Sequence, residues 1–155
     1  MLWQLLLGSL SLCASLSVSM GRKPGVMPPD ELATFVQTAG DKLIVVDVRN
    51  RDFSSEPGDG KSNEKAPLAA CGTPARPRAI NVLWDRASKS MDITLIPQSL
   101  IDAGGGLEKV PVITHCGGGG RGQKAKEYLE EAGFKVVANG GGPEDDECWA
   151  VFGDK

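Results

Sequence analysis

Residues 42–49, which read KLIVVDVR, form an almost continuous apolar run between two basic side chains. The run is too short for an ordinary helix, and its β-branched side chains favour a strand. Because apolar and polar residues do not alternate along it, we expect both faces of this strand to be buried. A strand of this kind is typical of a parallel sheet that helices cover on both sides.

Further short apolar runs alternate with segments whose apolar residues recur at helical spacing. We expect strands over 79–83, 110–114 and 135–138, and helices over 28–39, 97–103, 123–132 and 144–152. This alternation predicts an α/β fold with a central, mostly parallel sheet flanked by helices. Residues 50–78 are rich in glycine, proline, serine and charge and show little periodicity, so we expect a long irregular loop there.

Residues 1–20 differ in composition from the rest of the chain, because leucine, serine, valine and alanine dominate them and no charged side chain occurs before Arg22. We predict a secretory signal or organelle-targeting segment, with Ser17 and Ser19 as small residues beside a cleavage point. An uncleaved anchor helix is the alternative. The targeting interpretation leaves a folded domain over 21–155, without a stable membrane span in the mature form, in the secretory pathway or an organelle.

The charge balance and the cysteines argue against two classes of protein. A formal net charge of −3 disfavours a nucleic-acid backbone as the main partner, since proteins that bind one usually carry a basic face. The cysteines have no zinc-ligand spacing and the chain has one histidine, so we expect no structural metal site. Removal of residues 1–20 leaves an odd number of cysteines, which cannot form a complete disulfide framework. The cysteines of the whole chain are Cys13, Cys71, Cys116 and Cys148.

The stretch 114–122, THCGGGGRG, carries the strongest functional signal in the chain. Cys116 follows a predicted buried strand, at the edge of an α/β sheet where ligands bind. Glycines lack a Cβ, so the backbone after Cys116 can turn its N–H groups inward and, with the start of the next helix, cradle an anion. Arg121 supplies a fork of donors for a sulfate-like or phosphate group, and the same positive field favours the nucleophilic thiolate. The glycines whose amides we assign to this cradle are Gly117, Gly118, Gly119 and Gly120.

The spacing of Cys116 and Arg121 narrows the chemistry. Cysteine phosphatases use Cys-x5-Arg, whereas this chain has Cys-x4-Arg and a glycine at the next position. The ring is therefore one residue shorter than the one that holds a phosphate monoester. The letters from Gly117 to Gly122 also match the dinucleotide-binding pattern Gly-x-Gly-x-x-Gly, but any glycine run gives this match and too few residues follow for the rest of such a fold. Nucleotide binding stays a weaker alternative.

At this loop the sequence resembles the rhodanese (sulfurtransferase) family, whose six-residue loop begins with the nucleophilic cysteine and often ends in arginine. Residues 43–49 look like the family's strand ending in Asp-Val-Arg, and 79–82 look like the segment that follows its Gly-His-Ile-Pro-Gly motif. Gly141 and Gly142, with Trp149 behind them, resemble its closing Gly-Gly…Trp element.

The resemblance implies a rhodanese-like domain that transfers sulfane sulfur in two steps. Cys116 would attack the outer sulfur of a small anionic donor such as thiosulfate and carry that sulfur as a persulfide. A thiophilic acceptor (cyanide, a small thiol or a protein thiol) would then remove it. Arg121 would hold the anionic end of the donor and the amides of residues 117–120 the terminal sulfur of the persulfide. No metal or organic cofactor would take part.

The resemblance covers about residues 28–153 and has three departures, one of which is that the loop between Asp47 and Ala79 is longer than expected. Residues 74–78 read PARPR where the family has Gly-His-Ile-Pro-Gly, and the loop after Cys116 holds only glycine where the family often has arginine. A catalytically silent rhodanese-like domain that binds a partner or senses redox state is therefore the main alternative to an enzyme.

Several polar residues near these motifs are predicted to be structural. His115 should be packed or hydrogen-bonded rather than a general base, because adjacent strand residues point to opposite faces. Asp47 and Arg49 should form ion pairs or loop hydrogen bonds, and Cys148 should lie in the core. Cys71 is expected to be an incidental cysteine of the long loop, with a resolving thiol as the alternative.

Overall fold

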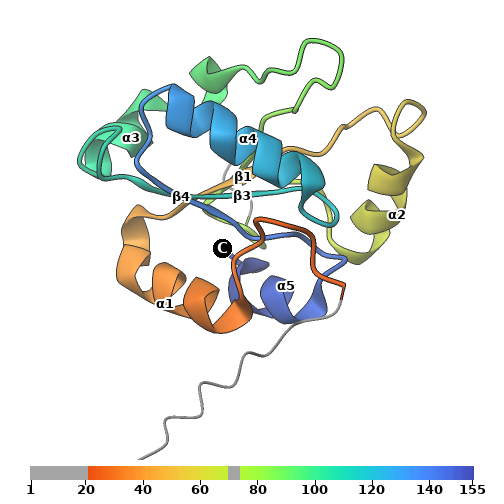
Figure 1. Ribbon diagram of the computed structural model, residues 1–155, viewed down its shortest axis with the longest axis horizontal. Coiled ribbons are helices and arrows are strands. Elements are labelled where there is room, and N and C mark those ends of the chain that lie inside the picture. The colour runs from red at the N-terminus through yellow and green to blue at the C-terminus, as the bar shows by residue number, and fades with distance from the viewer. Residues whose placement is uncertain (1–20, 70–73) are drawn as a thin grey trace, which may run out of the picture.

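The computed structural model describes residues 21–69 and 74–155, so the predicted targeting segment and Cys71 lie outside the described residues. Within the described part, the centre of the molecule is a sheet of four strands in the order β2-β1-β3-β4 (Figure 1). All neighbouring strands are parallel, which confirms the α/β class and the mostly parallel sheet. The strands are β1 (Ile44–Asp47), β2 (Ala79–Asn81), β3 (Pro111–His115) and β4 (Val136–Asn139).

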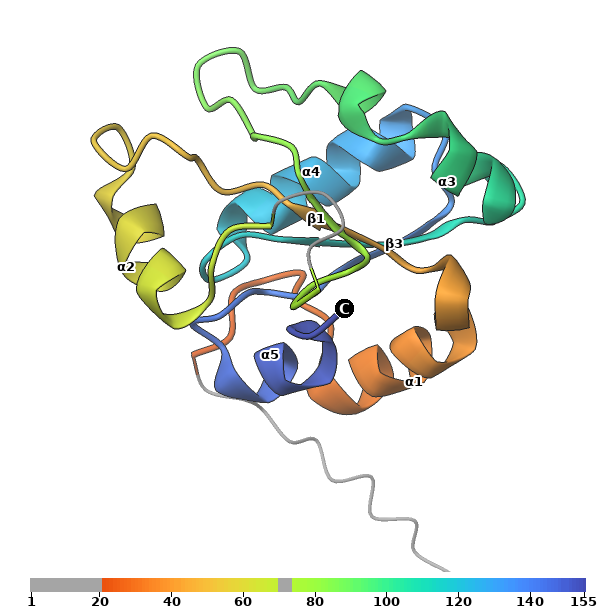
Figure 2. The ribbon, with the colours of Figure 1, turned by 180° about the vertical axis from the view of Figure 1, so that it is seen from behind.

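Helices pack on both faces of the sheet and beside it. The helices are α1 (Pro29–Ala39), α2 (Pro57–Lys65), α3 (Gln98–Ala103), α4 (Gly120–Glu131) and α5 (Asp146–Phe152), and the short 3-10 helices are η1 (Gly40–Lys42) and η2 (Ile93–Leu95). Helices α1 and α5 cover one face, α3 and α4 cover the other, and α2 lies beside the first turn of α4 in both views (Figures 1 and 2). In the part of the chain that the structure describes, no helix combines the length and the apolar character that a membrane span needs.

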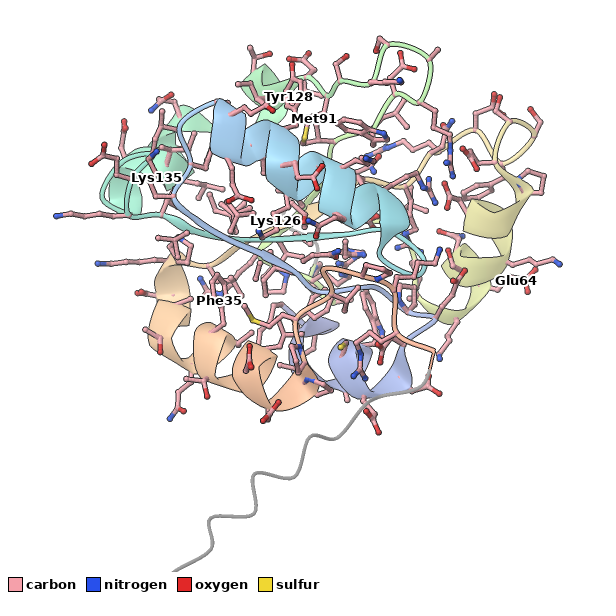
Figure 3. The ribbon with its side chains drawn as sticks, viewed as in Figure 1. Phe35, Glu64, Met91, Lys126, Tyr128 and Lys135 are labelled. Atoms are coloured by element: carbon pink, nitrogen blue, oxygen red, sulfur yellow. The ribbon has the colours of Figure 1, made fainter. Side chains whose placement is uncertain are left out.

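Neighbouring residues of β1 face two different cores, as the apolar run predicts. Val46 belongs to the core beneath α3 and α4, whereas Val45 belongs to the core beneath α1 and α5. Met91 belongs to the first of these cores and Tyr128 packs against it, whereas Phe35 packs against the second (Figure 3). Burying one valine or isoleucine side chain contributes roughly 1.5–3 kcal/mol to the free energy of unfolding. Because every residue of β1 is buried, this strand stabilises the packing on both faces of the sheet.

The described part of the segment 50–78 contains a helix that its composition does not predict. Pro57–Lys65 forms α2, so the expectation of an irregular loop is wrong there. Pro57 stands at the start of the helix, where its missing N–H has no helical partner to lose. The buried residues of α2 are Asp59 and Ser62, and both are polar. A search for apolar periodicity therefore passes over this helix.

Other element boundaries differ by a few residues from the predicted ones. Helix α4 begins at Gly120 rather than at 123, because Gly119 has a φ of 110° and acts as its N-cap, so the glycine run itself enters the first turn. Helix α5 begins at Asp146 rather than at 144, because the Asp145 side chain caps it by accepting a hydrogen bond from the Cys148 amide.

The register of the sheet gathers polar side chains at the carboxyl ends of the strands. Asp47 of β1 lies opposite His115 of β3, and Thr114 of β3 lies opposite Asn139 of β4. Cys116 directly follows β3 and therefore lies at the same edge, where parallel sheets of this class bind their ligands.

Candidate active site

Cys116 begins the loop between β3 and α4 and lines a cavity of about 740 Å³. The residue is only 3% exposed. The Gly119 amide donates a hydrogen bond to the Cys116 Sγ over 3.1 Å, and the Cys116 amide donates to the Gly141 carbonyl oxygen over 3.1 Å. A main-chain donor aimed at a sulfur atom stabilises negative charge on it. The loop therefore holds a thiol at the wall of a cavity with one amide already directed at its sulfur.

The four glycines of the predicted cradle have two different roles in the structure. Gly119 donates to the sulfur, whereas Gly117, Gly118 and Gly120 line the cavity beside Cys116. Among the residues that the structure describes, the Gly119 amide is the one main-chain donor to the Cys116 Sγ. The other glycines border the space that a molecule bound at the thiol would fill.

The loop needs glycine because two stretches of backbone approach each other closely. A Cβ on Gly119, whose φ is 110°, would lie 3.0 Å from the Gly141 Cα. A Cβ on Gly142, whose φ is 149°, would overlap the Cys116 carbonyl oxygen. Both φ angles also lie in the region that side chains disfavour. The resemblance-based pair Gly141 and Gly142 thus packs directly against the cysteine loop.

Arg121 lines the same cavity, but its two terminal nitrogens donate to the carboxylate of another residue of the protein. Its Nη1 donates to Asp59 Oδ2 over 2.7 Å and its Nη2 donates to Asp59 Oδ1 over 2.6 Å. Burial disfavours the charge on Arg121, but the hydrogen bonds to Asp59 outweigh burial and raise the pKa of the guanidinium. Asp59 comes from α2, and no local pattern in the sequence connects it with Arg121.

His115 is fully buried behind the loop, as expected for a structural histidine. Its Nε2 lies 2.7 Å from Arg76 Nη2, and its Nδ1 lies 3.0 Å from the Cys116 carbonyl oxygen. A guanidinium nitrogen can only donate, so Nε2 must accept and Nδ1 must carry the proton that is donated to Cys116. Burial, together with the charges of Arg76 and Arg49 and against the attraction of Asp47, lowers the pKa of His115 to about 4.

Asp47 is the buried anion of this network. Arg49 donates to its two carboxylate oxygens from Nε over 2.9 Å and from Nη2 over 2.7 Å, and Arg76 Nη1 donates over 3.0 Å. Burial by itself raises the pKa of Asp47, but its interactions with His115, Arg49 and Arg76 outweigh burial and hold that pKa below its ordinary value. The expected ion pair of Asp47 with Arg49 is confirmed. Arg76 is a partner that sequence reasoning missed, although it stands in the PARPR segment that departs from the family motif.

Two charged residues at the cavity were also missed, Lys23 and Glu144. The Glu144 amide donates to the Gly117 carbonyl oxygen over 2.9 Å, which places the Glu144 carboxylate over the loop. Lys23 reaches the loop because Met27, a few residues further on, donates its amide to the Asn139 carbonyl oxygen over 2.8 Å and so fixes this segment beside β4. Both residues lie far from Cys116 in the sequence, so spacing alone could not reveal them.

Cys148 lies apart from the cavity, in α5, and is fully buried, as expected for a core residue. Its Sγ donates to the Met27 carbonyl oxygen over 3.5 Å. Burial raises the pKa of the Cys148 thiol to about 11, with the negative charge of Asp145 adding to the effect. Cys116 and Cys148 are both free thiols, but only Cys116 lines the cavity.

Within residues 21–69 and 74–155, no group of three histidine, cysteine, aspartate or glutamate side chains converges as metal ligands would. No protein-family model matches the chain, and neither the curated proteins nor the solved structures contain a significant match to it. We therefore infer the function from the geometry of the site and from the sequence motifs that compose it.

Proposed function

We propose that the protein is a rhodanese-type sulfurtransferase in which Cys116 carries sulfane sulfur as a persulfide. One observation carries the proposal: the Gly119 amide donates to the Cys116 Sγ over 3.1 Å, at the wall of a cavity at the carboxyl end of a parallel sheet. This arrangement gives a cysteine both a main-chain donor at its sulfur and room for a small partner molecule. The Cys-x4-Arg spacing and the flanking motifs support the same assignment.

The reaction consists of two displacements at sulfur. In the first, the Cys116 thiolate attacks the outer sulfur of a donor such as thiosulfate, a new S–S bond forms, and the old S–S bond breaks with release of sulfite. In the second, cyanide or a thiolate attacks the terminal sulfur of the persulfide, which releases thiocyanate or a new persulfide and restores the Cys116 thiolate. Each step moves one electron pair onto its leaving group, so neither step requires a metal or an organic cofactor.

The surroundings of Cys116 suit the persulfide as well as the thiol. The terminal sulfur of a persulfide is anionic and extends about 2 Å beyond the cysteine sulfur, into the space that Gly117, Gly118 and Gly120 border. His115 donates to the Cys116 carbonyl oxygen and so holds the residue before the glycine run in place. His115 is neutral and buried, and we assign it a positioning role rather than proton transfer.

The test is sulfur transfer from thiosulfate to cyanide by the full-length chain, with thiocyanate as the product measured. We expect turnover by the wild type and by Cys148→Ser, a matched variant that removes the other buried thiol, but none by Cys116→Ser. Mass spectrometry after donor alone should find a gain of about 32 Da, one sulfur atom, on the peptide that contains Cys116. Absence of both turnover and adduct with every sulfane donor tried would overturn the proposal.

A catalytically silent redox or partner-binding domain is the second candidate, and one observation favours it. Asp59 occupies both terminal nitrogens of Arg121, the group expected to bind an anionic donor. Under this alternative, peroxide would oxidise Cys116 reversibly while the wild type transfers no sulfur. The same variants and the same peptide mass spectra therefore separate the two candidates.

A further inference from the structure

Glu144 brings a negative charge to the mouth of the cysteine loop. A Cβ built on Gly117 would lie 2.8 Å from Glu144 Oε1, and one built on Gly118 would lie 2.6 Å from Glu144 Oε2. The carboxylate therefore lies against the two glycines that follow Cys116. Among the described residues, Glu144 has no ion-pair partner within 4 Å, so its charge is not cancelled by a direct salt bridge.

The Arg121 guanidinium, which could offset the charge of Glu144, is already paired with Asp59. Both carboxylate oxygens of Asp59 accept from Arg121, over 2.7 and 2.6 Å, and the pair is nearly buried. Lys23 is another cation beside the loop, with its Nζ 3.5 Å from the position of a Cβ on Gly118. Of the charged side chains that line the cavity, Lys23 and Glu144 are the ones that lie against the glycines of the loop.

A second cavity of about 500 Å³ shares this wall, because Lys23, Gly118 and Glu144 line both spaces. The second cavity continues along the acidic segment that follows Glu144, whose members are Asp145, Asp146 and Glu147. Arg22 pairs with two of these acids and Lys65 with the third. A donor that extends from Cys116 past Gly118 therefore enters a region with little net positive charge.

We propose that Glu144 is a specificity-determining residue that selects sulfur donors of low negative charge. This inference depends on the proposed sulfurtransferase activity and names the substrate class for it. The site takes monoanionic or neutral sulfane donors, such as organic persulfides and thiosulfonates, in preference to the thiosulfate dianion. The reason is electrostatic, since the repulsion between the Glu144 carboxylate and a bound donor grows in proportion to the charge of the donor.

Two donors that differ by one charge test this preference. Thiosulfate is a dianion and releases sulfite, whereas methanethiosulfonate is a monoanion and releases methanesulfinate when the Cys116 thiolate takes its outer sulfur. In both reactions one S–S bond forms and one breaks, so the persulfide on Cys116 is the same. With cyanide as the acceptor, kcat/KM for each donor reports the first half-reaction alone.

Replacing Glu144 by glutamine should raise kcat/KM for thiosulfate about tenfold and that for methanethiosulfonate about threefold, because the logarithm of the effect is proportional to donor charge. Glu144→Asp, which keeps the charge, should retain the wild-type preference. Glu131→Gln is the matched control, since Glu131 lines the same cavity but ends α4, about 16 Å from the loop. High salt should shrink the effect of Glu144→Gln, as it would for any partly exposed charge.

The outcomes separate this inference from the proposed function. Persulfide formation on Cys116 with an unchanged donor ratio in Glu144→Gln would overturn the role of Glu144 and leave the sulfurtransferase intact. Absence of a persulfide with either donor would overturn the proposed function itself. Glu144 is an exposed residue, so the glutamine variant should keep the thermal unfolding midpoint of the wild type, and a large drop in that midpoint would also count against a purely electrostatic role.

Discussion

Arg121 and Asp59 form a bidentate salt bridge that joins α4 to α2 across 62 residues of sequence. The pair has two consequences. It fixes α2 beside the first turn of α4, and it removes the guanidinium fork from the group of donors available to a ligand at Cys116. The positive charge still stands at the cavity wall, but its two terminal nitrogens already have acceptors.

The first prediction concerns this pair. Asp59→Asn leaves a nearly buried guanidinium with a neutral partner, so we expect the free energy of unfolding to fall by roughly 3 kcal/mol. Urea denaturation measures the change. Glu56→Gln is the control, because it removes a more exposed ion pair, with Arg86, and should cost no more than about 1 kcal/mol. Equal losses in the two variants would mean that the Arg121 pair contributes no more than a surface salt bridge.

The strands could be predicted from sequence because each is a short, mainly apolar run. Residues 42–49 have this pattern, and β1 lies within them with every residue buried. Helix α2 could not be predicted in this way, because the side chains that it buries, Asp59 and Ser62, are held by polar contacts with Arg121 and Arg49. Partners of that kind are defined by the tertiary fold rather than by local periodicity.

The backbone of the candidate site could be predicted from the sequence, whereas several of the side chains that surround Cys116 could not. The strand, the cysteine and the glycine run are consecutive, so local reasoning places them at one sheet edge. Arg76 and Glu144 approach the loop from other parts of the chain, and their positions depend on how the segments before β2 and after β4 fold over it. A single sequence holds no pattern that connects such distant residues.

The second prediction tests the close approach of Gly142 to the cysteine loop. Alanine at this position would overlap the Cys116 carbonyl oxygen and also adopt a disfavoured φ, so Gly142→Ala should lower the free energy of unfolding by roughly 3 kcal/mol or more. Gly106 also has a positive φ, of 93°, but its Cβ would meet open space, so Gly106→Ala should cost about 1 kcal/mol. Urea denaturation of the two variants gives the comparison, and similar values would refute the steric argument.

The third prediction concerns the buried thiols of Cys116 and Cys148. Because burial raises the pKa of Cys148 to about 11, its thiolate fraction at about pH 8 should be roughly a hundredfold lower than in the unfolded chain. We expect iodoacetamide to alkylate Cys148 at least that much more slowly in the native protein than in urea. Peptide mass spectrometry follows Cys116 and Cys148 in the same sample. Native alkylation of Cys148 at the unfolded rate would show that this thiol is accessible and ionised.

The last prediction concerns His115, the one histidine of the chain. Burial, together with the charges of Arg76 and Arg49, lowers its pKa to about 4 in the folded state, against about 6.5 when unfolded. A group with a lowered folded-state pKa stabilises the fold fully above its unfolded pKa and loses that contribution as the pH falls towards the folded value. The free energy of unfolding should therefore fall by about 2 kcal/mol between about pH 7.5 and about pH 5.

This pH interval isolates the histidine, because Asp47 and Asp59 have pKa values below their ordinary ones and stay ionised throughout it. Urea denaturation at several pH values measures the stability, and the single imidazole resonance in an NMR titration measures the pKa directly. In His115→Gln the slope over this interval should disappear, whatever the absolute stability of the variant. A wild-type stability that is flat from about pH 7.5 to about pH 5, or an imidazole that titrates near 6.5, would contradict a neutral His115 held between Arg76 and the Cys116 carbonyl oxygen.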